Sequence, residues 1–213
     1  MSRIDKTKFD ITKTNDAIDR LLAVTTNPRH RFLLQTFYRH RFLEIAGRYE
    51  EIFAPEMTVE APVYHFNYSG IVTKLTGATA VKGLYGMWAQ THQSIFYVEK
   101  EQIAVADHFI ASVATAYQQV LGKALADNGI QVDDESGHYL YKTYGVQQIW
   151  PYDDRCRLVG EDVWETTPEA SEVVKLDPAD VVTSEQAGKL LNPLIKPLPS
   201  FDEAVLGKAR VAA

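Results

Sequence analysis

The sequence predicts an α+β domain in which helices pack on one face of a curved antiparallel sheet. Three observations support this class: helical periodicity dominates as far as residue 47, β-rich alternating segments follow, and turn-forming residues separate those segments. Helices followed by a run of strands are typical of α+β folds. The length of 213 residues suits one such domain with appendages at its ends.

The first helices are marked by their start signals. Asn27 and Pro28 have the residue types of an N-cap and a first helical position, so we expect a helix from Pro28 to about Gly47. A shorter helix is expected before it in "NDAIDRLLAV", and a short turn after it in "YEEIFAP". The period of "TGATAVKGLYGMWAQTH" predicts another helix.

The strands are expected in three regions. "EMTVEAPVYHF" alternates and is β-rich, and we expect Pro62 to interrupt it. "SIFYVEKEQIAVADHFIASVATAYQQVLGKAL" predicts two strands around a turn near Ala106 and Asp107, followed by a polar loop in "DNGIQVDDESG". "HYLYKTYGVQQIW" and "RCRLVGEDVWE", separated by a turn in "PYDD", predict a second hairpin.

We expect three parts along the chain: an N-terminal helical arm over residues 1–26, a domain over 27–166, and a C-terminal extended arm over 167–213. The last part is polar and then proline-rich, and Thr183 and Gln186 form a possible capping box for a short helix. The C-terminal arm could cover its own domain or a partner subunit.

The composition argues against several classes of protein. With 22 Lys and Arg against 28 Asp and Glu, and a net charge of −6, nucleic acid is not an expected partner. No apolar run reaches the length of a membrane span, and the N-terminus lacks the apolar segment of a signal peptide, so a cytoplasmic location is expected. The single Cys156 excludes an internal disulfide, and the six histidines lack ligand spacing. We expect no metal and no cofactor, because nucleotide-binding loops and zinc motifs are missing as well.

The five-residue sequence Arg-His-Arg-Phe-Leu occurs at residues 29–33 and again at 39–43. It could form a basic arm, or it could turn one polar group into an apolar cavity. At about 100° per residue, Arg41 falls on the same stripe as Leu34 and Tyr38, while Arg39 and His40 point away. This favours the second interpretation. Arg41 then either makes a structural salt bridge or, with Tyr38, forms the floor of a ligand cavity.

Two further places carry candidate proton donors and acceptors. In the next helix an apolar stripe ends in His92, which could be a core histidine or a general acid or base. In "GEDVW", either Glu161 or Asp162 must face the cavity, because neighbouring strand residues face opposite sides. The inward one could simply pair with Arg41.

The order of "GRYEEIFAPEMTVEAP", "LTGATAVKGLYGMWA", a strand hairpin and "YGVQQIWPYDDRCRLVGEDVWE" resembles the SnoaL-like branch of the nuclear-transport-factor-two-like superfamily, over residues 29–165. The resemblance implies a cone: a strongly bent antiparallel sheet around helices, with a deep apolar pocket. Relatives include polyketide cyclases, scytalone dehydratase, ketosteroid isomerase, limonene epoxide hydrolase, terpene-oxide lyases and non-catalytic binders. From the resemblance and the stripes together, we expect the following residues to line the pocket: Ala61, Tyr64, His65, Tyr85, Trp88, Tyr117, Val146 and Gln148.

The sequence departs from several of these relatives at their reactive positions. Ala61 and Val146 stand where the resemblance to ketosteroid isomerase would put its two acids, so that chemistry is not expected. The Arg-x-Asp motif of limonene epoxide hydrolase occurs only at Arg3 and Asp5, in the N-terminal tail. "AQTHQSIF" is similar to the setting of the scytalone dehydratase histidine, which favours His92.

These observations predict a cofactor-free lyase, isomerase or cyclase, with dehydratase-like proton transfer on an apolar small molecule such as a terpenoid, polyketide or steroid-like compound. His92 would move a proton, Tyr38 and Arg41 would polarise an oxygen, and the three would converge on one cavity. The inward member of Glu161 and Asp162 is the reserve candidate. The alternative is a non-catalytic ligand-binding or assembly module with the same fold. The resemblance also implies a homodimer that pairs through the outer face of the sheet.

Overall fold

The computed structural model describes residues 4–5 and 8–207, so Arg3 of the Arg-x-Asp motif and the two ends of the predicted arms lie outside the described residues. The helices are α1 (Asp16–Val24), α2 (Pro28–Ile45), α3 (Ala78–Gln90), α4 (Gly122–Asp127), α5 (Ser184–Leu191) and α6 (Phe201–Ala204). The strands are β1 (Thr58–Tyr68), β2 (Ile71–Thr76), β3 (Phe96–Ala106), β4 (Phe109–Leu121), β5 (His138–Pro151), β6 (Leu158–Glu165) and β7 (Glu172–Lys175).

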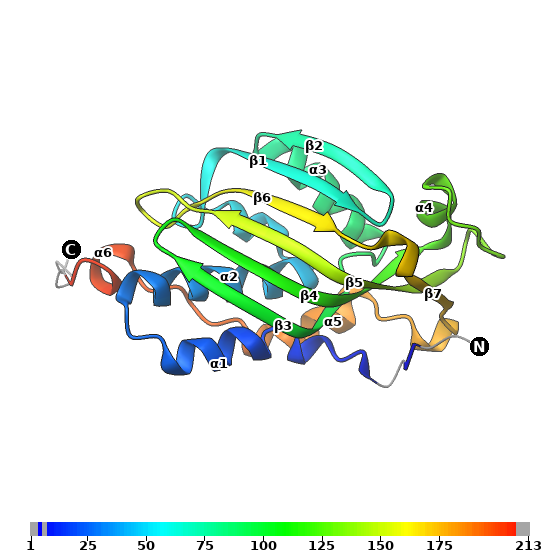
Figure 1. Cartoon of the computed structure of the whole chain (residues 1–213), viewed down its shortest axis with the longest axis horizontal. Helices are drawn as coiled ribbons and strands as arrows, with labels where there is room; N and C mark the ends of the chain where they lie inside the picture. Colours follow the sequence, from blue (N-terminus) through cyan, green and yellow to red (C-terminus); the bar gives the residue numbers. More distant parts are fainter. Residues whose placement is uncertain (1–3, 6–7, 208–213) are drawn as a thin grey trace.

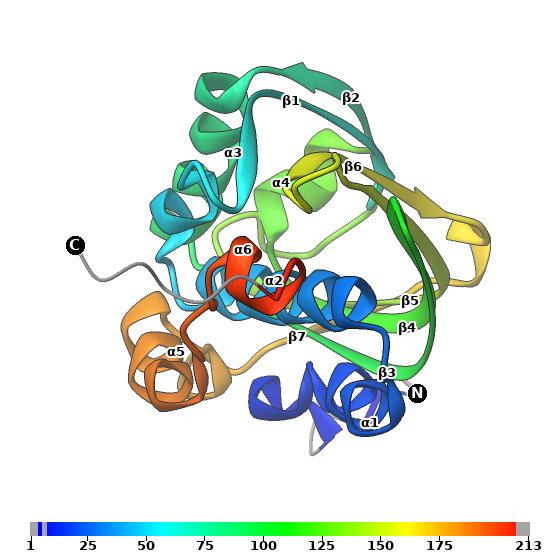
Figure 2. The same ribbon diagram turned by 90° about the vertical axis from the view of Figure 1, so that its left-hand side faces the viewer.

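The strands form one sheet in the order β2-β1-β6-β5-β4-β3, and β7 pairs with β5 beyond the end of β6. All neighbours are antiparallel except β1 and β6. The sheet bends around α2 without closing into a barrel, with β1 and β2 at one margin and β3 at the other (Figures 1 and 2). The predicted α+β class and its cone-shaped sheet are confirmed.

The parallel contact between β1 and β6 depends on a glycine. Gly160 pairs with Val63, and a Cβ atom on Gly160 would lie 1.9 Å from the Val63 carbonyl oxygen. A side chain at this position would therefore force the two strands apart. The close approach sets Tyr64 beside Glu161 in the register, and it fixes which residues of β6 face inward.

Helix α2 begins and ends as the sequence predicts. The side chain of Asn27 accepts hydrogen bonds from the backbone N–H groups of Arg29 and His30, with Pro28 at the first helical position. The chain leaves the helix through Gly47, whose φ of +71° is in the region that favours glycine.

Helix α2 is buried on almost every side, because the sheet covers one side and the C-terminal segment covers another (Figure 2). α5 and α6 contact α2, and the Phe32 ring packs edge-on against Phe201 of α6. The expectation that His40 points to solvent is wrong, since His40 is only 2% exposed. Because α2 is covered by the sheet and by the C-terminal segment, the position of a residue off the apolar stripe does not mean that it is exposed to solvent.

Several local predictions need correction. Pro62 does not interrupt β1, although the pairing of β1 with β6 shifts register between Thr58 and Val63. Strand β2 was not predicted, and the region predicted as the end of a strand and a polar loop contains α4. β7 joins the sheet from the C-terminal segment, which lies against its own domain. None of the helices in the described part of the chain is long and apolar enough to cross a membrane.

Candidate functional site

A cavity of about 70 Å³ lies between α2 and the concave face of the sheet, and we call it the inner cavity. Five of its lining residues are aromatic: Phe66, Tyr68, Trp88, Phe96 and Trp150. Five others are polar or charged: Arg41, Glu44, Gln118, Gln148 and Glu161. An apolar cavity with a few convergent polar groups is the usual form of a small-molecule site.

The charge of Arg41 is already compensated inside the protein. Its guanidinium donates two hydrogen bonds to Glu101 on β3, at 2.8 and 2.6 Å, and a third to the side-chain amide oxygen Oε1 of Gln148 at 3.1 Å. The side chains of Arg41 and Glu101 are 2% and 1% exposed. The structural salt bridge considered from the sequence is therefore present, but the partner is Glu101 rather than a residue of β6.

Of the two acids in "GEDVW", Glu161 faces the inner cavity and Asp162 faces outward. Asp162 pairs with His65 across the outer surface, with 2.6 Å between Oδ1 and Nδ1. Glu161 is 5% exposed and accepts a hydrogen bond from the Tyr85 hydroxyl at 3.3 Å. Burial raises the pKa of Glu161 to about 8, against the opposing effects of Arg41 and Tyr85.

Glu44 on α2 is a second carboxyl group in the same cavity. Burial, and then the charge of Glu161, raise the pKa of Glu44 well above its ordinary range. His40 lies near it, with 3.9 Å between His40 Nε2 and Glu44 Oε2. Burial lowers the pKa of His40 to about 3, so this imidazole is neutral and does not balance the glutamate.

Two neighbouring buried carboxyl groups cannot both ionise without a large cost, so they tend to share one proton at neutral pH. Such a pair holds an acid and a base in the same cavity. The Trp150 indole N–H adds a further donor, because it is buried and has no hydrogen-bond partner in the part of the chain that the structure describes. The arrangement can accept a proton, return one and bind a ligand oxygen.

The structure does not bring Tyr38, Arg41 and His92 together in one cavity, so the predicted convergence is wrong. Arg41 lines the inner cavity, whereas Tyr38 donates a hydrogen bond to the Leu194 carbonyl on the C-terminal segment, at 3.3 Å. α3 ends at Gln90, and His92 follows it with a φ of +57°. The helical period that placed His92 on the stripe therefore stops before His92.

The predicted pocket residues divide into two groups. Trp88, Val146 and Gln148 line the inner cavity. The other five do not line it. Tyr64 and Tyr85 pack against each other beside Glu161, and the Tyr117 hydroxyl donates a hydrogen bond to Glu99 in a separate cluster. His65 pairs with Asp162 on the outer surface, and Ala61 is exposed.

Glu44, Gln118 and Glu101 were missed from the sequence. For Glu44 a signal existed, because Phe37, His40, Arg41 and Glu44 follow the i, i+3, i+4, i+7 spacing of one helix face. That face is polar apart from Phe37, so it does not stand out as a core stripe.

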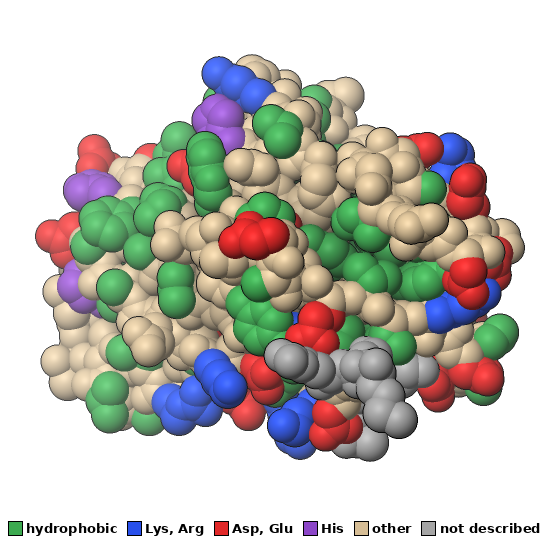
Figure 3. All heavy atoms as spheres, turned by 45° about the vertical axis from the view of Figure 1, so that its right-hand side comes forward, with side chains coloured by type: hydrophobic (Ala, Val, Ile, Leu, Met, Phe, Trp, Pro, Cys, Tyr) green, Lys and Arg blue, Asp and Glu red, His purple; other side chains and the backbone are tan. Residues whose placement is uncertain are grey.

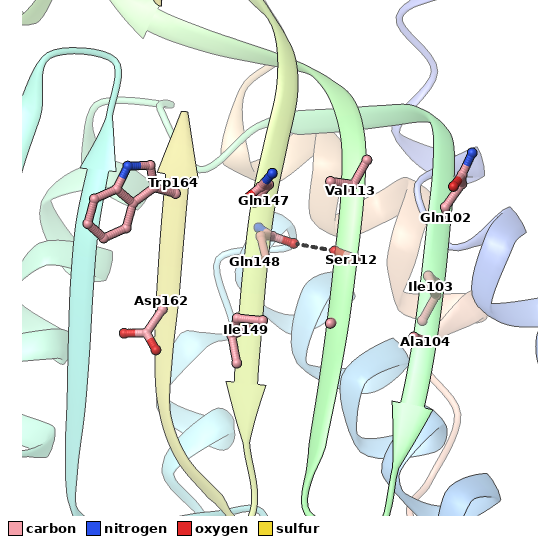
Figure 4. Close-up of a pocket in the computed structure, with 11 residues that line it drawn as sticks. Gln102, Ile103, Ala104, Ser112, Val113, Gln147, Gln148, Ile149, Asp162 and Trp164 are labelled. Carbon is pink, nitrogen blue, oxygen red and sulfur yellow. Dashed lines mark hydrogen bonds between the residues drawn. The ribbon is translucent and has the colours of Figure 1, made fainter. Parts of the chain in front are cut away.

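A second hollow, of about 510 Å³, lies on the outer face of the sheet over β3, β4, β5 and β6 (Figure 4). Trp164, Ile149 and Val113 are exposed there, and Figure 3 shows hydrophobic side chains spread over this face of the molecule. Its lining residues include Asp162 but no buried carboxyl pair.

The chain resembles SnoaL-like and NTF2-like proteins in its fold. A protein from Shewanella putrefaciens assigned to the SnoaL-like polyketide cyclases aligns over 70% of this chain and 87% of its own, at 8% identity and a TM-score of 0.48. A Jannaschia protein with the same assignment aligns over 67% and 90%, at 11% identity and a TM-score of 0.47.

A hub domain of a calcium/calmodulin-dependent kinase from S. rosetta aligns over 67% of this chain and all of its own, at 11% identity and a TM-score of 0.43. No protein-family model matches the sequence, and no curated protein matches it. Among the described residues, no group of three or more His, Cys, Asp or Glu is placed to hold a metal ion.

Proposed function

We propose that the protein is a cofactor-free acid–base enzyme, a lyase, isomerase or cyclase, that acts on a small molecule of low polarity. The observation that carries this proposal is the pair of buried carboxyl groups, Glu44 and Glu161, in an aromatic-walled cavity whose arginine is bound by another acid. Carboxyl groups with raised pKa values in a cavity are candidates for proton transfer near neutral pH.

In the proposed reaction, the ionised member of the pair removes a proton from a carbon atom of the substrate. The C–H electron pair forms a new double bond, and the adjacent C–O bond breaks as the protonated member gives its proton to the oxygen. A hydroxyl group then leaves as water. In an isomerisation the same two groups remove a proton at one carbon and return it at another. Positioned acid–base transfer of this kind contributes about 10²–10⁴-fold to a rate.

The remaining groups orient the substrate oxygen. The Gln148 amide is held through its carbonyl oxygen by Arg41 and by the Ser112 hydroxyl, at 3.1 and 3.2 Å. The unpaired Trp150 N–H is the donor we assign to the substrate oxygen. Tyr38 and His92, the donors proposed from the sequence, contact the C-terminal segment instead.

The test compares two adjacent acids of β6. Glu161→Gln should lower turnover of hydroxylated polyketides, allylic alcohols or terpene epoxides by about 10²-fold or more. Asp162→Asn, a matched control on the outer face, should retain turnover within about twofold. Incorporation of solvent deuterium into recovered substrate reports the proton transfer directly. Equal activity of the two variants, both folded by thermal melt, would remove the proposal.

The alternative is a ligand-binding or assembly module. The Arg41–Glu101 pair favours it, because a fully paired arginine is not available to bind a developing charge. A bound compound found by native mass spectrometry, released unchanged after long incubation and without deuterium uptake, would support this alternative.

We also propose a homodimer that pairs through the outer face of the sheet. Trp164 is 53% exposed and Ile149 is 42% exposed on that face. Contiguous exposed apolar side chains of this kind mark contact surfaces.

A further inference from the structure

A second chamber of about 270 Å³ adjoins the inner cavity, and we call it the outer chamber. It lies between the end of α3, the turn from β1 to β2, the end of β4, and α4. Three residues line both spaces: Tyr68, Trp88 and Gln118. The two spaces are therefore separated by side chains rather than by backbone layers.

The inner cavity alone is small for a substrate, since ligand pockets usually measure roughly 300–1,000 Å³. The two spaces together measure about 340 Å³, which lies within that range. A ligand of ordinary size that reaches the carboxyl pair therefore extends into the outer chamber as well. It must also be elongated, because the shared residues narrow the space between them.

Of the shared residues, Gln118 is more readily displaced than Trp88. Its amide N–H is held by one hydrogen bond, to the Gln93 carbonyl at 2.9 Å. Trp88, in contrast, is stacked on Tyr85 and packed edge-on against Phe66. Rotation of the Gln118 side chain costs one hydrogen bond and joins the two chambers, whereas movement of Trp88 would disturb an aromatic cluster.

Both chambers expose mainly apolar surface, and the carboxyl pair Glu44 and Glu161 lies in the inner cavity alone. The apolar residues of the outer chamber are Ile71, Met87, Val120, Leu121 and Ala124, and its charged residues, Lys123 and Asp127, pair with each other. A ligand that fills both thus carries its reactive polar group at one end and an apolar tail at the other.

The charges around the chambers disfavour an anionic head. Arg41 is held by Glu101, and Lys123 in the lining of the outer chamber is held by Asp127 at 2.8 Å. An anionic head in the inner cavity would lie beside Glu44 and Glu161, and among the lining residues described here no unpaired cation is available to balance its charge. A cationic head would leave both carboxyl groups ionised and remove the acid that the proposed reaction needs.

We infer that the protein takes an elongated amphipathic molecule, with an uncharged hydroxyl or carbonyl head in the inner cavity and an apolar tail in the outer chamber. The inference rests on the proposed function for the role of the head. The length of the ligand and the place of its tail rest on the two chambers alone.

The test uses simple probes in titration calorimetry: 1-butanol, 1-octanol, octanoate and octylammonium. 1-Octanol should bind at least about tenfold more tightly than 1-butanol, because its longer tail reaches the outer chamber. Octanoate should bind at least about tenfold more weakly than 1-octanol. Octylammonium binding more tightly than 1-octanol would overturn the uncharged head, and equal affinities of butanol and octanol would overturn the tail.

Variants then locate the tail. Ala124→Trp should fill the outer chamber and reduce 1-octanol affinity to that of 1-butanol, which itself should not change. Ala126→Trp, on the same helix but outside the lining, is the matched control. Met87→Trp, from the opposite wall, gives a second test if Ala124→Trp does not fold. Unchanged octanol affinity in a folded Ala124→Trp or Met87→Trp variant would contradict the assigned chamber.

The outcomes separate this inference from the proposed function. Octanol binding without turnover of any candidate substrate would retain the two-chamber site and reject the catalytic role. Turnover that depends on Glu161, with no effect of tail length or of the α4 and α3 variants, would retain the catalytic role and reject the two-chamber site.

Discussion

Arg41 and Glu101 are joined by two hydrogen bonds, of 2.8 and 2.6 Å, with both side chains almost completely buried. Glu101 is therefore the counter-ion of Arg41, although the charge of Arg41 still opposes the rise in the pKa of Glu44 and Glu161. We propose that the two glutamates share one proton at neutral pH, because burial raises the pKa of both.

Replacing only one residue of the Arg41–Glu101 pair should lower the free energy of unfolding far more than replacing both. Glu101→Gln leaves an uncompensated buried cation, so we expect a loss of about 3–5 kcal/mol in the free energy of unfolding. The double variant Arg41→Met, Glu101→Leu should recover most of that loss. Urea unfolding of the single and double variants measures the difference. Additive losses in the double variant would show that the pair is not coupled in this way.

His40 should make the fold sensitive to acid. Its pKa is lowered from the ordinary 6.5 to about 3 by burial, so the unfolded chain binds the proton more tightly. The contribution to stability is complete above about pH 6.5 and is lost progressively as the pH falls toward 3. His40→Phe should flatten this part of the stability profile. His108→Phe, at an exposed position, is the control and should not.

Glu161 should make the fold less stable as the pH rises, which is the opposite of the effect of His40. Its folded-state pKa is raised to about 8, so its contribution to stability is complete below about pH 4.5 and is lost as the pH rises through about 8. Glu161→Gln should therefore become relatively more stable than the wild type as the pH is raised from 5 to 9. Thermal melts across this range would measure the change, and parallel profiles for the two proteins would contradict it.

His92 tests the interpretation made from the sequence. Its Nδ1 accepts a hydrogen bond from the Ser184 backbone N–H at 3.3 Å, where α5 begins. His92→Asn keeps a residue that tolerates positive φ, so folding should survive. We expect faster hydrogen exchange in α5 and turnover within about twofold of the wild type. Loss of turnover with α5 still protected would restore His92 as the proton carrier.

The outer face of the sheet should control assembly. If two copies pair there, light scattering should give about twice the 24.0 kDa mass of the chain at micromolar concentration. Trp164→Glu should shift the protein toward the monomer, because a charge would be buried at the contact. Leu190→Glu, an exposed position on α5 and away from the sheet, should have no effect. A wild-type monomer would contradict the proposal.

The elements that the sequence predicted well are those with local signals. The Asn27 cap, the turn near Asp107 and the Thr183–Gln186 capping box are all present, because each depends on neighbouring residues alone. The site was predicted less well. Arg41 was placed inside correctly, but its partner Glu101 is 60 residues away, and no local pattern connects them.

The errors on α2 share one physical cause. The assignment of Tyr38 and His40 assumed that α2 has one buried face and one exposed face. The C-terminal segment covers the second face, so Tyr38 contacts Leu194 and His40 lies against Trp150. Glu44 was overlooked for the same reason, since its position was not on the stripe expected to be buried.

The covering of α2 from both sides has a consequence for synthesis. α2 and the sheet that packs on it, including β7, are complete in the nascent chain before residues 184–204, which contain α5 and α6, have been made. During that interval Phe32 lacks its contact with Phe201, and the side of α2 that later contacts α5 and α6 is open to other proteins. A ribosome-bound chain that has exposed β7 but not α5 should therefore recruit chaperones, whereas one that has exposed residue 207 should not.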